Sequence, residues 1–244
     1  MIFIKKHIKL IVLLIVLAVT FSIYKVTNYE NINYTALGDG FSLGINSYGE
    51  INYGYSDYIR DYLQKENKLN YYIKDFSTPT MSIENLYENI VVNKKVKISK
   101  KELNIKQTLR ESNIITLSVG INDLIYRIST TENMNEKKLD NIINEISESL
   151  DLLLTEIRKY YPYEIYVVGY YYPNTSNIYL QKGLQKLNEL YNEKENIVYI
   201  STTDIIKSDS NYLSNPNSIY PNNAGYKAIS DKIILKISKK LEKR

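Results

Sequence analysis

The chain has 244 residues, which is enough for one α/β domain with a sizeable core and a short additional segment. It contains no cysteine, which excludes disulfides, thiolate zinc sites and lipidated cysteines. The formal net charge is +4, but four lysines lie among the first 25 residues, and subtracting them from the 31 basic residues leaves 27 against 27 acidic ones. A surface that binds nucleic acid normally carries a basic excess, so this balance argues against nucleic acid as a partner.

The first 27 residues have the pattern of a membrane-targeting segment. Lysines at positions 5, 6 and 9 precede an apolar run at 10–24, slightly shorter than the roughly 20 residues that span a bilayer comfortably. No good small-residue cleavage site follows, so we predict an uncleaved anchor with one transmembrane helix, and a cleaved signal peptide is the alternative. Because positive residues stay cytoplasmic, residues 28–244 are expected outside the cell membrane, and secreted if the segment is cleaved.

Beyond this segment, hydrophobic periodicity predicts strands that alternate with helices. The expected strands are residues 32–37, 69–76, 113–119, 164–170 and 197–200. The expected helices are residues 56–65, 82–91, 135–160, 179–192 and 223–241. This alternation indicates α/β architecture: a five-stranded parallel sheet covered on both faces, in a three-layer α/β/α sandwich. We expect residues 28–244 to form one such domain.

Short polar sequences predict the local details between these elements. Ser56 is expected to cap the helix that it opens, and residues 42–55, rich in Gly, Asn and Tyr, are expected to form a loop. The sequence Ser99-Lys100-Lys101-Glu102 has the Ser-x-x-Glu spacing of a capping box, which predicts a short helix starting there.

Three short stretches in chain order carry the functional signal. Residues 36–44 read Ala-Leu-Gly-Asp-Gly-Phe-Ser-Leu-Gly after the first strand, and residues 120–123 read Gly-Ile-Asn-Asp after the third. Residues 217–226 read Asn-Ser-Ile-Tyr-Pro-Asn-Asn-Ala-Gly-Tyr where the last helix opens. Each is weak alone, since the second could equally be an Asn-Asp turn that caps a helix. Together they resemble the motifs of the SGNH (GDSL-type) hydrolase family, whose flavodoxin-like fold the strand and helix pattern would suit.

The resemblance implies that the catalytic groups of the family are missing here. In that family a Ser attacks an ester carbonyl, a His takes its proton and an Asp orients the His. The matching positions are Gly40, Tyr220 and Asn217, so we expect no catalytic residue among them. The only histidine is His7, beside the apolar run. A phenol is a poor base at neutral pH because its pKa is near 10.

The resemblance also places the remaining site residues. It implies that Asn122, Thr80 (uncertain by a residue or two) and Gly40 surround an oxyanion position, while Asp39 and Asp123 line the pocket. Ser42 is a fallback nucleophile, although a turn or helix-cap hydroxyl is the preferred interpretation. No cofactor is expected. The carboxylates and Asn217 lack a recognisable metal-ligand spacing, so no metal is expected either.

These observations lead to one preferred function and two alternatives. We expect a membrane-anchored, catalytically inactive SGNH-like domain that binds a cell-envelope glycan, a lipid or a protein partner. Gly40 is expected to leave room in the pocket, with Tyr220 adding an aromatic face. The first alternative is an active esterase or acyl-ester hydrolase that uses Ser42. The second is a structural or assembly module in which the cleft has no role.

Overall fold

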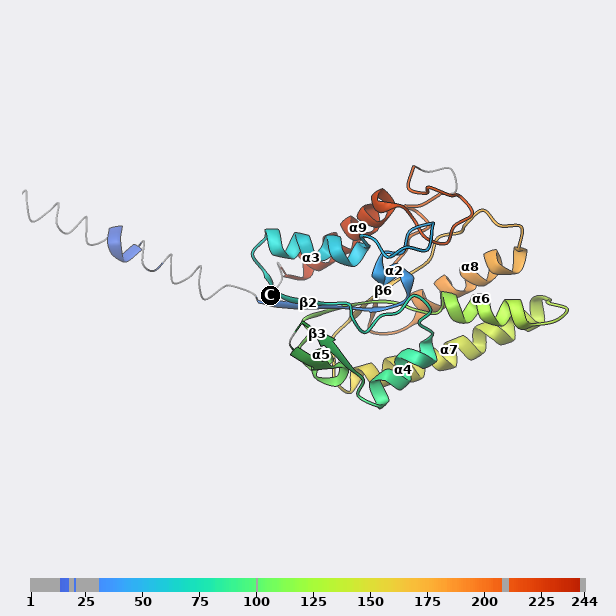
Figure 1. The fold of residues 1–244 in the computed structure, drawn as a ribbon, viewed down its shortest axis with the longest axis horizontal. Helices are drawn as coiled ribbons and strands as arrows, with labels where there is room; N and C mark the ends of the chain where they lie inside the picture. The colour runs from blue at the N-terminus through green and yellow to red at the C-terminus, as the bar shows by residue number, and fades with distance from the viewer. Residues whose placement is uncertain (1–13, 18–19, 21–30, 100, 208–210, 242–244) are drawn as a thin grey trace, which may run out of the picture.

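The computed structural model describes residues 14–17, 20, 31–99, 101–207 and 211–241 (Figure 1). The predicted membrane segment, residues 1–27, therefore lies largely outside the described residues. Among the helices that are described, none has both the length and the apolar character needed to cross a bilayer.

Five parallel strands form one sheet in the order β2–β1–β5–β6–β7. Their bounds are β1 Ile32–Gly38, β2 Leu69–Ile73, β5 Ile114–Ser118, β6 Ile165–Val168 and β7 Ile197–Ile200. This is the flavodoxin-like order, and it confirms the predicted five-stranded parallel sheet. The strand order reverses between the neighbours β1 and β5, and ligands of such sheets bind at the carboxyl ends of these two strands.

Helices cover both faces of the sheet (Figure 1). On one face, α3 (Tyr55–Lys65) packs against α9 (Asn223–Leu241), and the one-turn helix α2 (Gly40–Leu43) follows β1 directly. The other face carries α4 (Ile83–Val91), α5 (Ile105–Glu111), α6 (Ile121–Thr130), α7 (Glu136–Arg158) and α8 (Ile178–Glu193). The expected three layers are therefore present.

The pattern of buried residues explains these elements. Every residue of β5 is buried, as expected for a central parallel strand covered on both faces. Helix α7 buries one apolar stripe at helical spacing. Its members are Leu139, Ile142, Ile146, Leu150, Leu153, Leu154 and Ile157.

The capping-box prediction at residues 99–102 is wrong. This region is an antiparallel hairpin of β3 (Lys95–Ile98) and β4 (Lys101–Asn104), and Ser99 lies in its turn with a φ of +54°. The apolar side chains of the hairpin pack against the core, which outweighs the local Ser-x-x-Glu pattern. The helix that follows, α5, is capped by the Asn104 side chain, which accepts the N–H of Gln107.

Two details near the first motif also differ from expectation. Gly54 rather than Ser56 caps α3, and the Asp57 carboxylate accepts the Gly54 N–H at 3.0 Å. The Ser56 hydroxyl instead donates to the Ser42 carbonyl at 2.6 Å. Residues 40–43, partly assigned to a loop, form α2, and its C-cap Gly44 has a φ of +80°.

Candidate functional site

Asp39 connects the carboxyl ends of three strands. It follows β1, and its Oδ1 accepts the Phe41 N–H at 2.9 Å, which caps α2. The same atom accepts the Ser118 hydroxyl, at the end of β5, at 3.0 Å. Its Oδ2 accepts the hydroxyl of Tyr170, just beyond β6. These contacts enclose Asp39 completely, with 0% exposure, so the prediction that it lines a pocket is wrong.

The enclosure of Asp39 changes its acidity. Burial raises the pKa of its carboxyl to about 7, although the hydrogen bonds from Tyr170, Phe41 and Ser118 act in the opposite direction. The side chain is therefore a structural acid that titrates near neutrality, with no access to a substrate.

Tyr220 fills the space beside Gly40. A Cβ built on Gly40 would lie 2.5 Å from the Tyr220 hydroxyl oxygen and 2.7 Å from its Cε1. No side chain fits at position 40 while the phenol stays where it is. The prediction that Gly40 leaves room in the pocket is therefore wrong. The Tyr220 ring, at the position of the family's base, occupies the space that a nucleophilic side chain at position 40 would need. Burial, aided by the nearby charge of Asp39, also raises the pKa of Tyr220 to about 12.

Phe41 is the centre of an aromatic cluster at this point. Its ring centroid lies 5.2 Å from that of Tyr170 and 5.8 Å from that of Tyr226, both edge-on. Tyr220 and Tyr171 complete the cluster with tilted rings at 6.1 and 6.2 Å. Such contacts stabilise beyond simple burial, by about 0.5–1.5 kcal/mol for each pair. The cluster closes the region where the resemblance places the reacting groups.

Ser42, the fallback nucleophile, lies inside this closed region. Its side chain has 0% exposure, and its hydroxyl donates to the Asp39 carbonyl at 2.8 Å. A nucleophilic Ser needs a base within hydrogen-bond reach of its hydroxyl. The backbone carbonyl that accepts this proton cannot serve as one.

Asn122 holds a neighbouring segment. Its side-chain nitrogen donates to the carbonyls of Pro79 and Met81, at 3.2 and 3.0 Å. Both amide hydrogens are thereby used to fix residues 79–81 against α6. Thr80 lies in this fixed segment and is exposed. The geometry thus brings Thr80 and Asn122 together, with the donors of Asn122 directed at the backbone.

Asp123 is a helix cap. Its two carboxylate oxygens accept the N–H of Ile83, the first residue of α4, at 3.2 and 3.1 Å. Burial raises the pKa of Asp123, while this backbone contact acts in the opposite direction. A carboxylate at a helix N-terminus is also favoured by the helix dipole. Its place in the motif therefore has a structural explanation.

Asn217 is separate from both groups. It is exposed, and its backbone N–H donates to the Asn215 side chain at 2.9 Å. Among the described residues, no hydrogen bond joins the Asn217 side chain to Tyr220. The site predicted from the motifs is therefore divided in three. Gly40, Ser42 and Tyr220 lie in the aromatic cluster, Thr80, Asn122 and Asp123 lie beside α4, and Asn217 lies on a surface loop.

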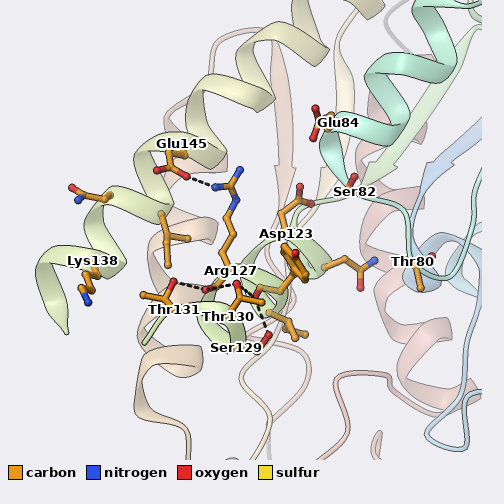
Figure 2. Close-up of a pocket in the computed structure, with 15 residues that line it drawn as sticks. Thr80, Ser82, Glu84, Asp123, Arg127, Ser129, Thr130, Thr131, Lys138 and Glu145 are labelled. Atoms are coloured by element: carbon orange, nitrogen blue, oxygen red, sulfur yellow. Dashed lines mark hydrogen bonds and ion pairs between the residues drawn. The ribbon is translucent and has the colours of Figure 1, made fainter. Parts of the chain in front are cut away.

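A groove of about 900 Å³ begins at the second of these groups (Figure 2). Thr80, Asn122 and Asp123 form one end, and the groove continues along α6 and α7 to Lys138 and Glu145. Figure 2 shows Asp123 pointing toward the start of α4. Within the described part of the chain, no group of three His, Cys, Asp or Glu side chains could hold a metal ion.

A comparison with protein-family models identifies the family of this chain. The model of GDSL-like lipases and acylhydrolases matches residues 34–233, which includes all three motifs. The chain belongs to the GDSL-like lipase/acylhydrolase family. The resemblance inferred from the motifs is thereby confirmed. No curated protein matches the chain significantly.

Solved structures of low sequence identity share the fold of this GDSL-like chain. A lipase from a goat rumen metagenome is 21% identical with a TM-score of 0.67, covering 84% of this chain and 97% of its own. A catalytic mutant of an acetylxylan esterase from Geobacillus stearothermophilus is 15% identical with a TM-score of 0.60, covering 85% and 94%. A family 3 carbohydrate esterase from Clostridium thermocellum is 14% identical with a TM-score of 0.55, covering 87% and 98%.

Sequence reasoning missed two residues that shape the GDSL-like site. Phe41 and Tyr170 enclose Asp39, and neither stands at a motif position that carries chemistry. A signal for them exists in the sequence. Phe41 lies inside the first motif, and Tyr170 follows β6, so both lie at the same edge of a parallel sheet as Asp39.

Proposed function

We propose that this chain is a catalytically inactive member of the GDSL-like family that binds a ligand of the cell envelope without cleaving an ester. The observation that carries the proposal is the position of Tyr220. Its ring occupies the space where a nucleophilic side chain at position 40 would stand. Acyl transfer needs a nucleophile, a base and a site for the reacting carbonyl within about 3 Å of both, and a half-buried phenol beside Gly40 supplies neither the nucleophile nor the base.

The other groups nearby do not replace the lost chemistry. Ser42 is buried and donates to a backbone carbonyl. Tyr220, with a pKa of about 12, stays protonated at neutral pH and accepts no proton there. Asn122 uses both amide hydrogens on backbone carbonyls, so it has no donor for an oxyanion.

The proposed location rests on the sequence of the first 27 residues. A lysine-rich start followed by an apolar run supports a single-pass anchor, with the GDSL-like domain outside the membrane. A tethered binding domain would meet glycans, lipids or proteins of the envelope, and the groove along α6 and α7 offers a place for one of them.

The test is hydrolysis of p-nitrophenyl acetate by the full-length protein in detergent. We expect no turnover above the buffer rate, with Ser42→Ala indistinguishable from the unmodified protein. The triple variant Gly40→Ser, Asn217→Asp, Tyr220→His restores the family's residues but leaves the Asn122 amide on the carbonyls of Pro79 and Met81, so it should stay inactive as well. Activity of the unmodified protein that disappears in Ser42→Ala would show an active esterase and refute the proposal.

A further inference from the structure

The side chains that line the groove along α6 and α7 indicate the class of ligand that it could bind. Three elements form it: the segment at the start of α4, the outer face of α6 and the first half of α7 (Figure 2). Its volume of about 900 Å³ lies in the range of small-molecule sites. Its lining mixes the hydroxyls and amides of Ser, Thr and Asn side chains with apolar surface, which suits a ligand that has both polar groups and an apolar face.

Both cations that line the groove have a partner within the protein. Arg127 forms an ion pair with Glu145, as Figure 2 shows, and the Lys138 ammonium donates to the Glu132 carbonyl at 2.7 Å. The Glu145 carboxylate offsets the charge of Arg127, so the groove carries no excess of free positive charge that would favour an anionic ligand. Glu84 has no hydrogen bond or ion pair among the described residues, so its carboxylate can accept from ligand hydroxyls.

The groove also offers an aromatic surface and a free amide. The Tyr126 side chain is 69% exposed, so its ring is available for stacking. Asn141, opposite on α7, has no hydrogen bond among the described residues and presents one donor group and one acceptor group. Only Ile125 and Ile142 add aliphatic surface, which is too little to enclose a fatty acyl chain.

We propose that this groove binds an uncharged oligosaccharide, with its rings against Tyr126 and its hydroxyls on Asn141 and Glu84. A pyranose has an apolar face and a rim of groups that both donate and accept, which matches a tyrosine ring flanked by an amide and a carboxylate. The inference rests on the proposed function, because it names the ligand class that an inactive domain would retain. It places the binding site beside Thr80 and Asn122 and outside the aromatic cluster.

Calorimetric titration of the full-length protein with chitotetraose and cellotetraose tests this inference. We expect saturable binding of at least one of them, and a loss of affinity of about tenfold in Tyr126→Ala. Tyr126→Phe, which keeps the ring, should stay within about twofold, and Asn141→Ala should lose a few-fold. The matched control is Tyr48→Ala, since Tyr48 is 80% exposed and lies outside the groove. It should bind like the unmodified protein.

Three outcomes would overturn the inference. They are no binding of either sugar, equal binding by Tyr126→Ala, and binding only of decanoate or of a capped trialanine peptide, which represent a lipid and a protein ligand. All titrated samples are also assayed with p-nitrophenyl acetate. Turnover with sugar binding intact would refute the proposed inactivity alone, whereas no turnover and no sugar binding would refute the groove inference alone.

Discussion

The buried carboxyl of Asp39 predicts an unusual dependence of stability on pH. Its pKa rises from an ordinary 3.8 to about 7 in the folded protein. Between these values the folded state holds a proton that the unfolded state has released. The contribution of the Asp39 carboxyl to the free energy of unfolding is therefore fully present below about pH 4, falls as the pH rises toward 7, and stays low above it. The shift of about three units corresponds to up to about 4 kcal/mol.

The substitution Asp39→Asn removes this dependence and keeps the contacts. An amide oxygen can accept from the Phe41 N–H and the Ser118 hydroxyl, and the amide nitrogen can donate to the hydroxyl of Tyr170. We therefore expect the variant to stay within about 1 kcal/mol of the unmodified protein at pH 4.5 and to exceed it at pH 8 by up to about 4 kcal/mol. In a chain of this length, that difference raises Tm by about 10 °C.

Urea unfolding of both proteins at pH 4.5, 6 and 8 measures this effect. Other groups with shifted pKa values are present in both proteins, so the difference between the two curves isolates position 39. If the difference does not change with pH, or if the variant is the less stable protein at pH 8, then Asp39 is ionised in the folded state and the reasoning is refuted.

Two further predictions concern glycines near the site. Gly40→Ser should lower the free energy of unfolding in urea by about 1–3 kcal/mol, because the added side chain meets Tyr220. The same substitution in a Tyr220→Ala background should lower it by close to nothing. Equal losses in both backgrounds would contradict the packing of Tyr220 against Gly40. Gly38→Ala should lose more than about 4 kcal/mol, because its φ is +130° and a Cβ would lie 1.8 Å from the Ser118 carbonyl oxygen. Gly49→Ala is the matched control, since Gly49 has a φ of +81° but nothing lies within 4 Å of a Cβ built on it. It should lower the free energy of unfolding by only about 1 kcal/mol. A Gly38→Ala variant as stable as this control would rule out the clash with Ser118.

The sequence predicted most of the fold because its long elements carry strong periodicity. Helix α9 and strand β7 have the predicted bounds, and the predicted helix at 135–160 differs from α7 by only a few terminal residues. The elements that the sequence did not predict correctly are short. The hairpin at residues 95–104 depends on pairing between two strands of four residues, and α6 buries only three of its ten residues. Neither leaves a periodic signal long enough to detect.

The motifs located the candidate site residues but not their geometry. They placed Gly40 and Tyr220 at the ends of different elements, and nothing in either motif shows that the phenol lies against the glycine. That contact joins segments far apart in the chain, so it depends on how the loop before α9 crosses the sheet edge. The same applies to Asn122, whose role is set by the carbonyls of residues 79–81.

The motif positions that keep the family's residues and those that differ from them need different explanations. Asp39 caps α2 and receives hydrogen bonds from beyond β5 and β6, so its removal would damage the sheet edge whether or not a substrate binds. Asp123 does the same for the start of α4. Gly40 is constrained by the space that Tyr220 occupies, and Tyr220 by its packing against Phe41 in the aromatic cluster. A motif residue with a structural role can therefore remain where the reacting groups have been replaced, and retained acids in such a motif are no evidence of activity.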